Sequence, residues 1–250
     1  DMNFQTAETI KGVTIALEKL KSKYFVVLGD RYESFAAAIA ANLMRIKIIH
    51  LHGGETTLGA LDNKLRHSIS QLSNLHFTSA EIHKKKVQTI TNTIENIHNI
   101  GPMVIDGILN LSRISVKEFG KRTGFVFGEN NFLVTFHSET LSKDFGLGCF
   151  KNLLYALDQF NCNILFTSPN VDKGYKDIKE LIYSFVNKKA SQRFFVPSLG
   201  HELYLNSLIL FDSVIGNSSS GLIEAPIIGT KVLNIGDRQK GRFKFGEVID

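Results

Sequence analysis

The stretch YFVVLGDRYESFAAAIAANLMRIKIIHL, residues 24–51, decides the fold. It begins with a short unbroken apolar run (Tyr24–Leu28), continues with helical spacing over residues 32–45, and ends in a second strand-like run (Lys47–Leu51). Unbroken apolar runs of this length are typical of strands that are buried on both faces of a parallel sheet. A strand, a helical crossover and a second strand form a βαβ unit, so the stretch predicts an α/β fold with parallel strands.

The same alternation continues on both sides of this stretch. Further helices are expected over residues 10–20, 64–72 and 81–90, and further strands over residues 75–79, 132–136, 163–167, 193–197, 212–215 and 231–235. The pattern weakens between residues 111 and 131, where we place a domain junction. Two doubly wound domains are predicted, over residues 1–112 and 113–250. The first strand has the pattern of a central strand, so we expect terminal segments beyond both ends of this chain.

Composition narrows the possible partners. The 250 residues are 43% apolar, which supplies a sizeable core. The formal net charge of +5 mildly favours an anionic ligand, but no block or stripe of basic residues indicates a nucleic-acid partner. No apolar run approaches the roughly 18 residues of a membrane span. Cys149 and Cys162 lack metal-binding spacing and are expected to be reduced, which indicates a soluble, cytoplasmic protein with no membrane partner.

Polar residues follow the expected strands, where α/β sheets form their pockets. After the first strand, LGDRYE contains Asp30, which could cap the next helix or act as a base held ionised beside Arg31. After the second strand comes HLHGGETTLGALDNKLRH, which contains Glu55 and Asp62 on one connection. Its two adjacent glycines allow a sharp turn close to a ligand.

The end of this connection has helical spacing. Asp62 and Arg66 lie four residues apart, which also suits an ordinary surface ion pair. The histidines of the connection match no standard pattern of metal ligands, so no metal is expected. These histidines are His50, His52 and His67.

In the second half, His137 lies at a strand end in TFHSET, where an imidazole could bind phosphate or relay a proton, although a lone histidine often only packs. Asn170 in TSPNVDKG could donate to a ligand or belong to an ordinary turn. Arg238, in NIGDRQKGR, could bind phosphate or belong to a surface turn.

GNSSSGLIEAP is the strongest phosphate signal in the chain. A glycine and three serines lead from a strand into an expected helix, where free N–H groups and the helix dipole favour an anion. The serines are Ser218, Ser219 and Ser220, and Glu224 follows in the helix, where it could accept hydrogen bonds from a ribose.

Taken in order, these motifs resemble the hydrolysing UDP-N-acetylglucosamine 2-epimerases, including members that act on sialic and legionaminic acid precursors. The resemblance covers essentially the whole chain. It implies two Rossmann-like domains in a GT-B type fold, with the site in the interdomain cleft. The implied reaction eliminates UDP from a UDP-2-acetamido sugar and then hydrates the glycal, which releases UDP and the C2-inverted sugar. It also implies no metal or other cofactor, and a homodimer or homotetramer.

The family's pattern implies roles for single residues. Asp30 and Asp62 match acids that move protons around C2 or stabilise C1, and His137 matches a histidine at the phosphate or the leaving oxygen. The implied binding residues are Ser218, Ser219 and Arg238 for phosphate, Glu224 for the ribose and Tyr204 near uracil, and we add Arg66, Asn170 and Ser220 to the substrate-binding set.

Two departures from the family leave alternatives open. Many members have a catalytic glutamate at the position of His52, so either His52 or Glu55 would take its role. The family's glycine–arginine phosphate-binding turn does not precede Asp1. The sugar could be UDP-N-acetylglucosamine or a UDP-2,4-diacetamido-trideoxyhexose. The alternative functions are a UDP-sugar-dependent GT-B glycosyltransferase and a non-catalytic nucleotide-sugar sensor.

Overall fold

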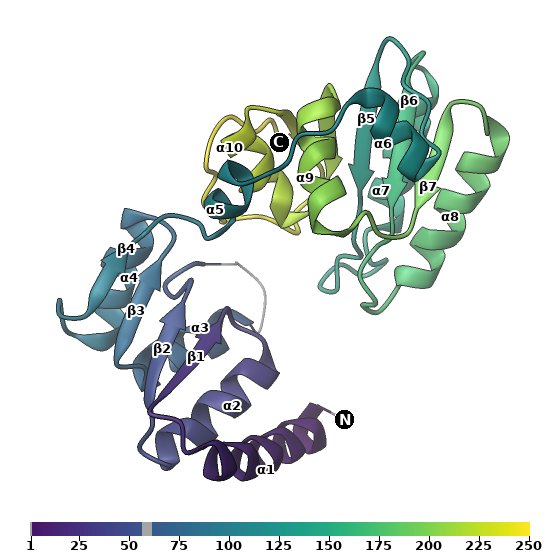
Figure 1. The fold of residues 1–250 in the computed structure, drawn as a ribbon. Coiled ribbons are helices and arrows are strands. Elements are labelled where there is room, and N and C mark those ends of the chain that lie inside the picture. The colour runs from purple at the N-terminus through teal and green to yellow at the C-terminus, as the bar shows by residue number, and fades with distance from the viewer. Residues whose placement is uncertain (1, 57–61) are drawn as a thin grey trace. The chain divides into compact units, whose positions relative to one another are not determined.

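The computed structural model describes residues 2–56 and 62–250, except for the side chain of Asp62 (Figure 1). The chain divides into two compact units, Asp1–Met103 and Val104–Asp250, and each is described by itself. Each unit contains one sheet in which all paired strands are parallel. This confirms the predicted α/β class.

The first unit alternates helices and strands from its start. Its four strands pair in the order β1-β2-β3-β4. The elements are α1 (Met2–Leu20), β1 (Tyr24–Leu28), α2 (Tyr32–Leu43), β2 (Lys47–Leu51), α3 (Asp62–Leu72), β3 (Leu75–Thr78), α4 (Glu81–Thr91) and β4 (Ile97–Asn99).

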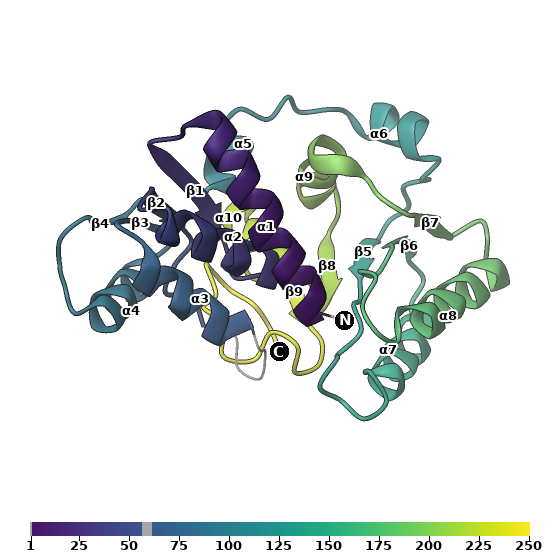
Figure 2. The ribbon, with the colours of Figure 1, turned by 90° about the horizontal axis from the view of Figure 1, so that it is seen from below.

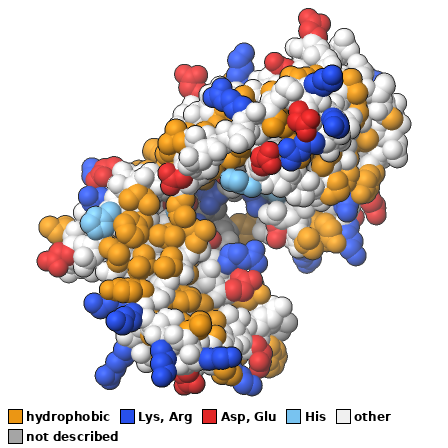
Figure 3. All heavy atoms as spheres, viewed as in Figure 1, with side chains coloured by type: hydrophobic (Ala, Val, Ile, Leu, Met, Phe, Trp, Pro, Cys, Tyr) orange, Lys and Arg blue, Asp and Glu red, His pale blue; other side chains and the backbone are white. Residues whose placement is uncertain are grey.

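The core of the first unit lies on one face of its sheet. Val27 and Ile48 pack with Ile69 of α3 and with small residues of α2, whose buried alanines let this helix lie close to its neighbours. On the opposite side of β1, Val26 and Leu28 are exposed, and apolar side chains gather over these strands in Figure 3. Among the described residues β1 pairs with β2 alone.

The second unit contains a five-stranded sheet in the order β7-β6-β5-β8-β9. Its elements are α5 (Val104–Leu109), α6 (Val116–Thr123), β5 (Asn131–Thr135), α7 (Leu147–Asp158), β6 (Asn163–Thr167), α8 (Tyr175–Lys188), β7 (Arg193–Val196), α9 (Gly200–Leu210), β8 (Ser213–Gly216), the 3₁₀ helix η1 (Ser219–Gly221), α10 (Glu224–Ile228) and β9 (Lys231–Asn234).

Helices cover both faces of this second sheet (Figure 2). On one face, Val134 and Phe166 pack against α7 and α8. On the other face, Leu133 and Leu165 pack against α6 and α9. Successive residues of a strand point to opposite faces, so the unbroken apolar runs of β5 and β6 fill both layers.

Residues 104–111, which precede the first strand of the second unit, pack with that unit. Val104, Ile108 and Leu111 contact the core built by Phe119, Leu205 and their neighbours. Residues 104–112, which the sequence assigns to the first domain, therefore belong to the second unit. Because α5 has only 6 residues, the spacing of its apolar positions does not show which core they join.

The order of the second sheet reverses between β5 and β8, and α/β sheets form ligand crevices beyond such a reversal. Thr135 and Gly216 are register partners at the ends of these strands. Gly216 has a φ of 137°, and a Cβ at this residue would overlap the carbonyl oxygen of Thr135. A glycine is therefore required at this point of the sheet.

We predict that Gly216→Ala lowers the free energy of unfolding by about 3 kcal/mol or more, because backbone strain and overlap with Thr135 add together. Gly229→Ala is the matched control, since Gly229 has a φ of 93° but open space around the new Cβ. Urea unfolding of both variants measures the difference. Equal losses would contradict the close approach of β5 and β8.

Candidate active site

Three neighbouring strands of the first unit place polar residues at their carboxyl ends. Asp30 follows β1, Glu55 lies in the loop after β2, and Ser79 follows β3. Because parallel strands end at the same edge of a sheet, residues far apart in sequence meet there. Arg66, on α3, contacts two of these three residues.

The guanidinium of Arg66 is the centre of this cluster. Its Nη1 donates to Glu55 Oε2 at 3.0 Å and to the carbonyl oxygen of His52 at 3.0 Å, and its Nη2 donates to Asp30 Oδ2. Only 3% of the Arg66 side chain is exposed. A buried cation needs charged partners, and Arg66 has two carboxylates.

Glu55 is held as a carboxylate. Burial alone would raise its pKa, but hydrogen bonds from His52 and Ser79, together with the charge of Arg66, hold the pKa of Glu55 well below its usual range. Its Oε1 is 2.9 Å from Nδ1 of His52 and 2.8 Å from Oγ of Ser79. This carboxylate is therefore a strong hydrogen-bond acceptor and a weak base.

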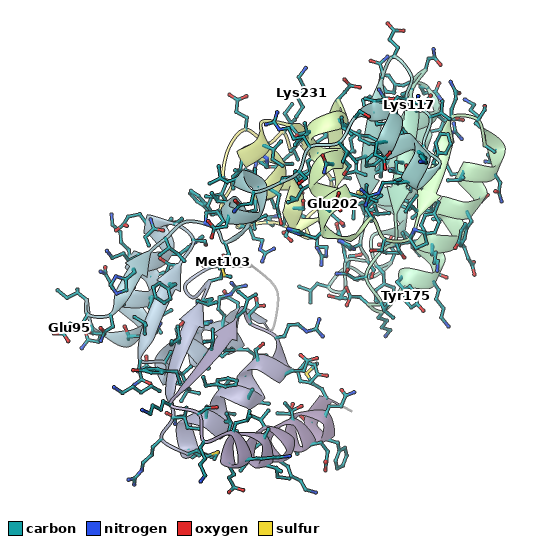
Figure 4. The ribbon with its side chains drawn as sticks, viewed as in Figure 1. Glu95, Met103, Lys117, Tyr175, Glu202 and Lys231 are labelled. Atoms are coloured by element: carbon teal, nitrogen blue, oxygen red, sulfur yellow. The ribbon has the colours of Figure 1, made fainter. Side chains whose placement is uncertain are left out.

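The turn after β2 fixes the direction of His52. His52 has a φ of 60° and Gly54 a φ of 79°, both in the left-handed region. A Cβ on Gly54 would overlap the carbonyl oxygen of His83 in α4, so the turn packs against that helix. The backbone N–H of Met103, labelled in Figure 4, lies 3.4 Å from Nε2 of His52.

Several expectations for the residues of the first unit change. Arg31, and not Asp30, is the N-cap of α2, and Arg31 pairs with Glu33 at the surface. Arg66 pairs with Asp30. The predicted contribution of Asp62 concerns a side chain outside the described residues.

The remaining histidines of the connection differ from His52. His50 is fully buried between Oγ of Ser70, at 3.1 Å, and the carbonyl oxygen of Gly29, at 2.9 Å. Burial lowers the pKa of His50 to about 4. His67 is partly buried, and burial lowers its pKa as well. In the part of the chain that the structure describes, no group of three or more His, Cys, Asp or Glu side chains could hold a metal ion.

In the second unit, Asn217 joins the ends of β5 and β8. Its Oδ1 accepts from the backbone N–H of His137 at 2.7 Å, and its Nδ2 donates to the carbonyl oxygen of His137 at 2.8 Å. Sequence reasoning did not select Asn217, although its place directly after the last residue of β8 was an available signal. This side chain fixes His137 at the reversal of the strand order.

The imidazole of His137 is neutral. Burial and the charge of Arg238 lower the pKa of His137 to about 4. Its Nδ1 accepts from the backbone N–H of Asn170 at 3.0 Å, so Nε2 holds the proton. Arg238 donates from Nη1 to the carbonyl oxygen of Asn217 at 3.1 Å, which places a cation beside an N–H donor. This pair suits an anionic oxygen.

The serine-rich stretch forms a shorter structure than expected. The expected single helix is the 3₁₀ turn η1 followed by the five-residue α10, which begins at Glu224. Ser218 caps η1 by accepting from the N–H of Ser220 at 3.4 Å. The hydroxyl of Tyr204 donates to Oγ of Ser220 at 2.6 Å, and burial raises the pKa of Tyr204 to about 12. Ser219 is partly buried beside them.

Three further features concern the cysteines, the surface charges and the helices. Cys149 and Cys162 are free thiols. Basic and acidic side chains are interspersed on the face seen in Figure 3. Within the described residues, no helix combines the length and apolar character needed to cross a membrane.

We predict that Arg66→Leu lowers the free energy of unfolding at pH 7 by about 3–5 kcal/mol, because it leaves two carboxylates without their cation. The loss should shrink at acid pH, where these carboxylates take up protons. Arg31→Leu removes an arginine from an exposed pair and should cost at most about 1 kcal/mol. Urea unfolding at pH 7 and pH 4.5 provides the comparison, and similar losses for both variants would contradict the central role of Arg66.

We also predict that the protein loses stability between pH 6.5 and pH 4. His50, His76 and His137 have pKa values lowered from 6.5 to about 4, chiefly by burial. The unfolded chain then binds protons that the folded chain does not, so stability present above pH 6.5 is lost as the pH falls. By pH 5, each imidazole accounts for a loss of at most about 2 kcal/mol in the free energy of unfolding. Urea unfolding from pH 7.5 to 5 should show this slope, His76→Leu should reduce it, and a flat profile would contradict it.

Comparison with known proteins gives the chain a family. Residues 1–249 match the family model described as UDP-N-acetylglucosamine 2-epimerase. The GDP/UDP-N,N'-diacetylbacillosamine 2-epimerase (hydrolyzing) of Campylobacter jejuni is 38% identical over 94% of this chain and 62% of its own length. Polysialic acid biosynthesis protein P7 of Escherichia coli is 39% identical over 90% of this chain and 57% of its own length. The chain thus spans about three fifths of these relatives.

A solved structure shows the same fold. UDP-GlcNAc 2-epimerase from Neisseria meningitidis, bound to UDP-GlcNAc, superposes with a TM-score of 0.80 at 19% identity, over 96% of this chain and 67% of that one. The match of residues 1–249 to the family model, together with the 38% identity to the Campylobacter jejuni relative, means that the chain belongs to the UDP-N-acetylglucosamine 2-epimerase family.

Proposed function

We propose that the full-length protein is a hydrolysing 2-epimerase that acts on a UDP-2-acetamido sugar. A base removes the proton from C2 while the bond between C1 and the phosphate oxygen breaks, which gives a glycal and UDP. Water then adds its hydroxyl to C1, and a proton returns to C2 on the opposite face. The products are UDP and the C2-inverted free sugar.

The observation that best supports this proposal is the charge arrangement around Arg66. The C2 hydrogen is not acidic, so its removal needs positive character at C1 and a stabilised leaving group. Asp30 and Glu55 are paired with Arg66, and Glu55 contacts His52. Carboxylates beside an imidazole provide both a base and negative charge for a cationic C1.

We assign the general base to His52 rather than to Glu55. Glu55 accepts from Arg66, His52 and Ser79, and its lowered pKa makes it a weak base. The Nδ1–H of His52 points to this carboxylate, so Nε2 has the lone pair that can take a proton. Glu55 then orients the imidazole, and Asp30 faces the developing charge at C1. Asp62 keeps its predicted role as an acid that moves protons around C2 or stabilises C1.

The second unit would bind the nucleotide. The Nε2–H of His137 and the cation of Arg238 suit the diphosphate and stabilise its charge as it leaves. Ser218, Ser219 and Asn170 would add donors to the phosphates. Glu224 would accept hydrogen bonds from the ribose, and the hydrogen-bonded pair of Tyr204 and Ser220 would lie near uracil.

We propose that both clusters act on one substrate molecule, as the GT-B type arrangement expected from the sequence requires. The Campylobacter jejuni relative is named for diacetylbacillosamine, so UDP-2,4-diacetamido-trideoxyhexose is the first candidate substrate and UDP-N-acetylglucosamine the second. The homo-oligomeric state and the cytoplasmic location stay predictions.

The test incubates the full-length protein with each UDP-sugar in D₂O. We expect UDP release without an added acceptor, and one deuterium at C2 of an inverted free sugar, detected by mass spectrometry and NMR. A requirement for an acceptor would indicate a glycosyltransferase, and binding without turnover would indicate a sensor. Either result would overturn the proposal.

Variants then separate the two clusters. Glu55→Gln should lower kcat by about 100-fold or more with little change in KM, because it removes the partner of the base. Arg238→Ala should mainly raise KM. Lys240→Ala is the matched control for Arg238, since Lys240 is exposed and pairs with Asp237. Equal effects of Glu55→Gln and Arg238→Ala on kcat and KM would contradict this division of labour.

A further inference from the structure

Two buried residues outside the predicted site are linked to the carboxylate that orients His52, one directly and the other through the first. Ser79 directly follows β3 and is 2% exposed, and His83 lies in the first turn of α4 and is 6% exposed. Oγ of Ser79 is 2.8 Å from Oε1 of Glu55 and 2.9 Å from Nδ1 of His83. The three side chains form a continuous chain of hydrogen bonds.

The number of protons available fixes the donor and the acceptor of each of these hydrogen bonds. Glu55 is ionised, so its Oε1 can only accept, and the single hydroxyl proton of Ser79 must point to it. Oγ of Ser79 then has only lone pairs for His83, so Nδ1 of His83 must hold a proton. The order is His83 Nδ1–H to Ser79 Oγ–H to Glu55 Oε1.

Oε1 of Glu55 also accepts a hydrogen bond from His52. Nδ1 of His52 lies 2.9 Å from Oε1 of Glu55, so it also holds a proton. In a neutral imidazole the second nitrogen then has a free lone pair. Nε2 of His52 is that nitrogen, and the N–H of Met103 at 3.4 Å fits an acceptor there.

We propose that Ser79 and His83 are positioning residues that hold Glu55 in place, so that Nε2 of His52 stays the proton acceptor. Ser79 and His52 share one oxygen of Glu55, so the donor from Ser79 limits how strongly the carboxylate attracts the proton of His52. The effect on turnover rests on the proposed function, whereas the proton positions do not.

Other charged and titratable side chains surround Glu55. Arg66 faces it from α3 and is shared with Asp30. His50, on β2, stays neutral because burial, with smaller contributions from His76, Arg66 and His52, lowers its pKa to about 4. His67, on α3, forms a hydrogen bond with the backbone of Glu55, and burial lowers the pKa of His67. His83 reaches the carboxylate of Glu55 through Ser79.

Ser79→Ala in the full-length protein is the central test. Without the hydroxyl, Glu55 has one donor fewer and attracts the proton of His52 more strongly, so His52 becomes easier to protonate. We expect kcat to fall about tenfold, KM to change little, and the acid limb of kcat/KM to move to higher pH. Ser79→Thr keeps the hydroxyl and should restore the wild-type profile.

Ser73→Ala is the matched control, because the hydroxyl of Ser73 is partly buried and donates to the carbonyl oxygen of Ile69. It should leave both kcat and the acid limb unchanged. A loss of activity in Ser79→Ala without a shift of the acid limb would indicate a merely structural role and would overturn the proposal.

Two substitutions of His83 give a second comparison. His83→Asn places an amide N–H near the position of Nδ1 and should retain most of the activity and the acid limb. His83→Leu removes the donor and should shift the acid limb in the direction of Ser79→Ala. Identical behaviour of the two variants would overturn the role of Nδ1.

Histidine ¹⁵N NMR tests the proton positions without turnover. In full-length protein labelled with [¹⁵N]histidine, His83→Asn identifies the His83 signals, and we expect a protonated Nδ1. An unprotonated Nδ1 would overturn the proposal even in an active enzyme. If the wild-type protein releases no UDP while His83 shows a protonated Nδ1, the proposed function fails and the hydrogen-bond chain stands.

Discussion

The structure of the first unit depends on the buried guanidinium of Arg66. A cation with 3% of its side chain exposed loses most of its hydration, and only charged partners in good geometry offset that loss. Asp30 and Glu55 supply the charge, and the carbonyl oxygen of His52 accepts a third bond. Because these groups follow two different strands, their pairing with one helix residue fixes both loops against each other.

The second unit positions His137 through hydrogen bonds to its backbone. The amide of Asn217 makes two hydrogen bonds with the backbone of His137, and the imidazole is kept neutral. A neutral donor beside Arg238 can approach an anion without the desolvation cost of a second buried charge. In the first unit the partners of a buried cation are carboxylates, whereas in the second unit Arg238 lowers the pKa of a neutral imidazole.

Most of the fold could be predicted from apolar runs and helical spacing, but contacts between distant residues could not. β4 was missed because it has three residues and two of them, His98 and Asn99, are polar. The glycine turn and the strand-end positions of Asp30 and His137 followed from local patterns. The partners of Arg66 did not, since Asp30 lies 36 residues away and only the folded sheet edge brings them together. Ser79 and His83 had no local signal for the same reason.

The left-handed backbone of His52 limits how this position can change over evolutionary time. Asparagine, aspartate, glycine and histidine enter that region more readily than other residues, whereas β-branched side chains are excluded by steric overlap. The resemblance places a glutamate here in other family members. A glutamate at this position would therefore have to adopt the left-handed backbone, or the turn itself would have to change.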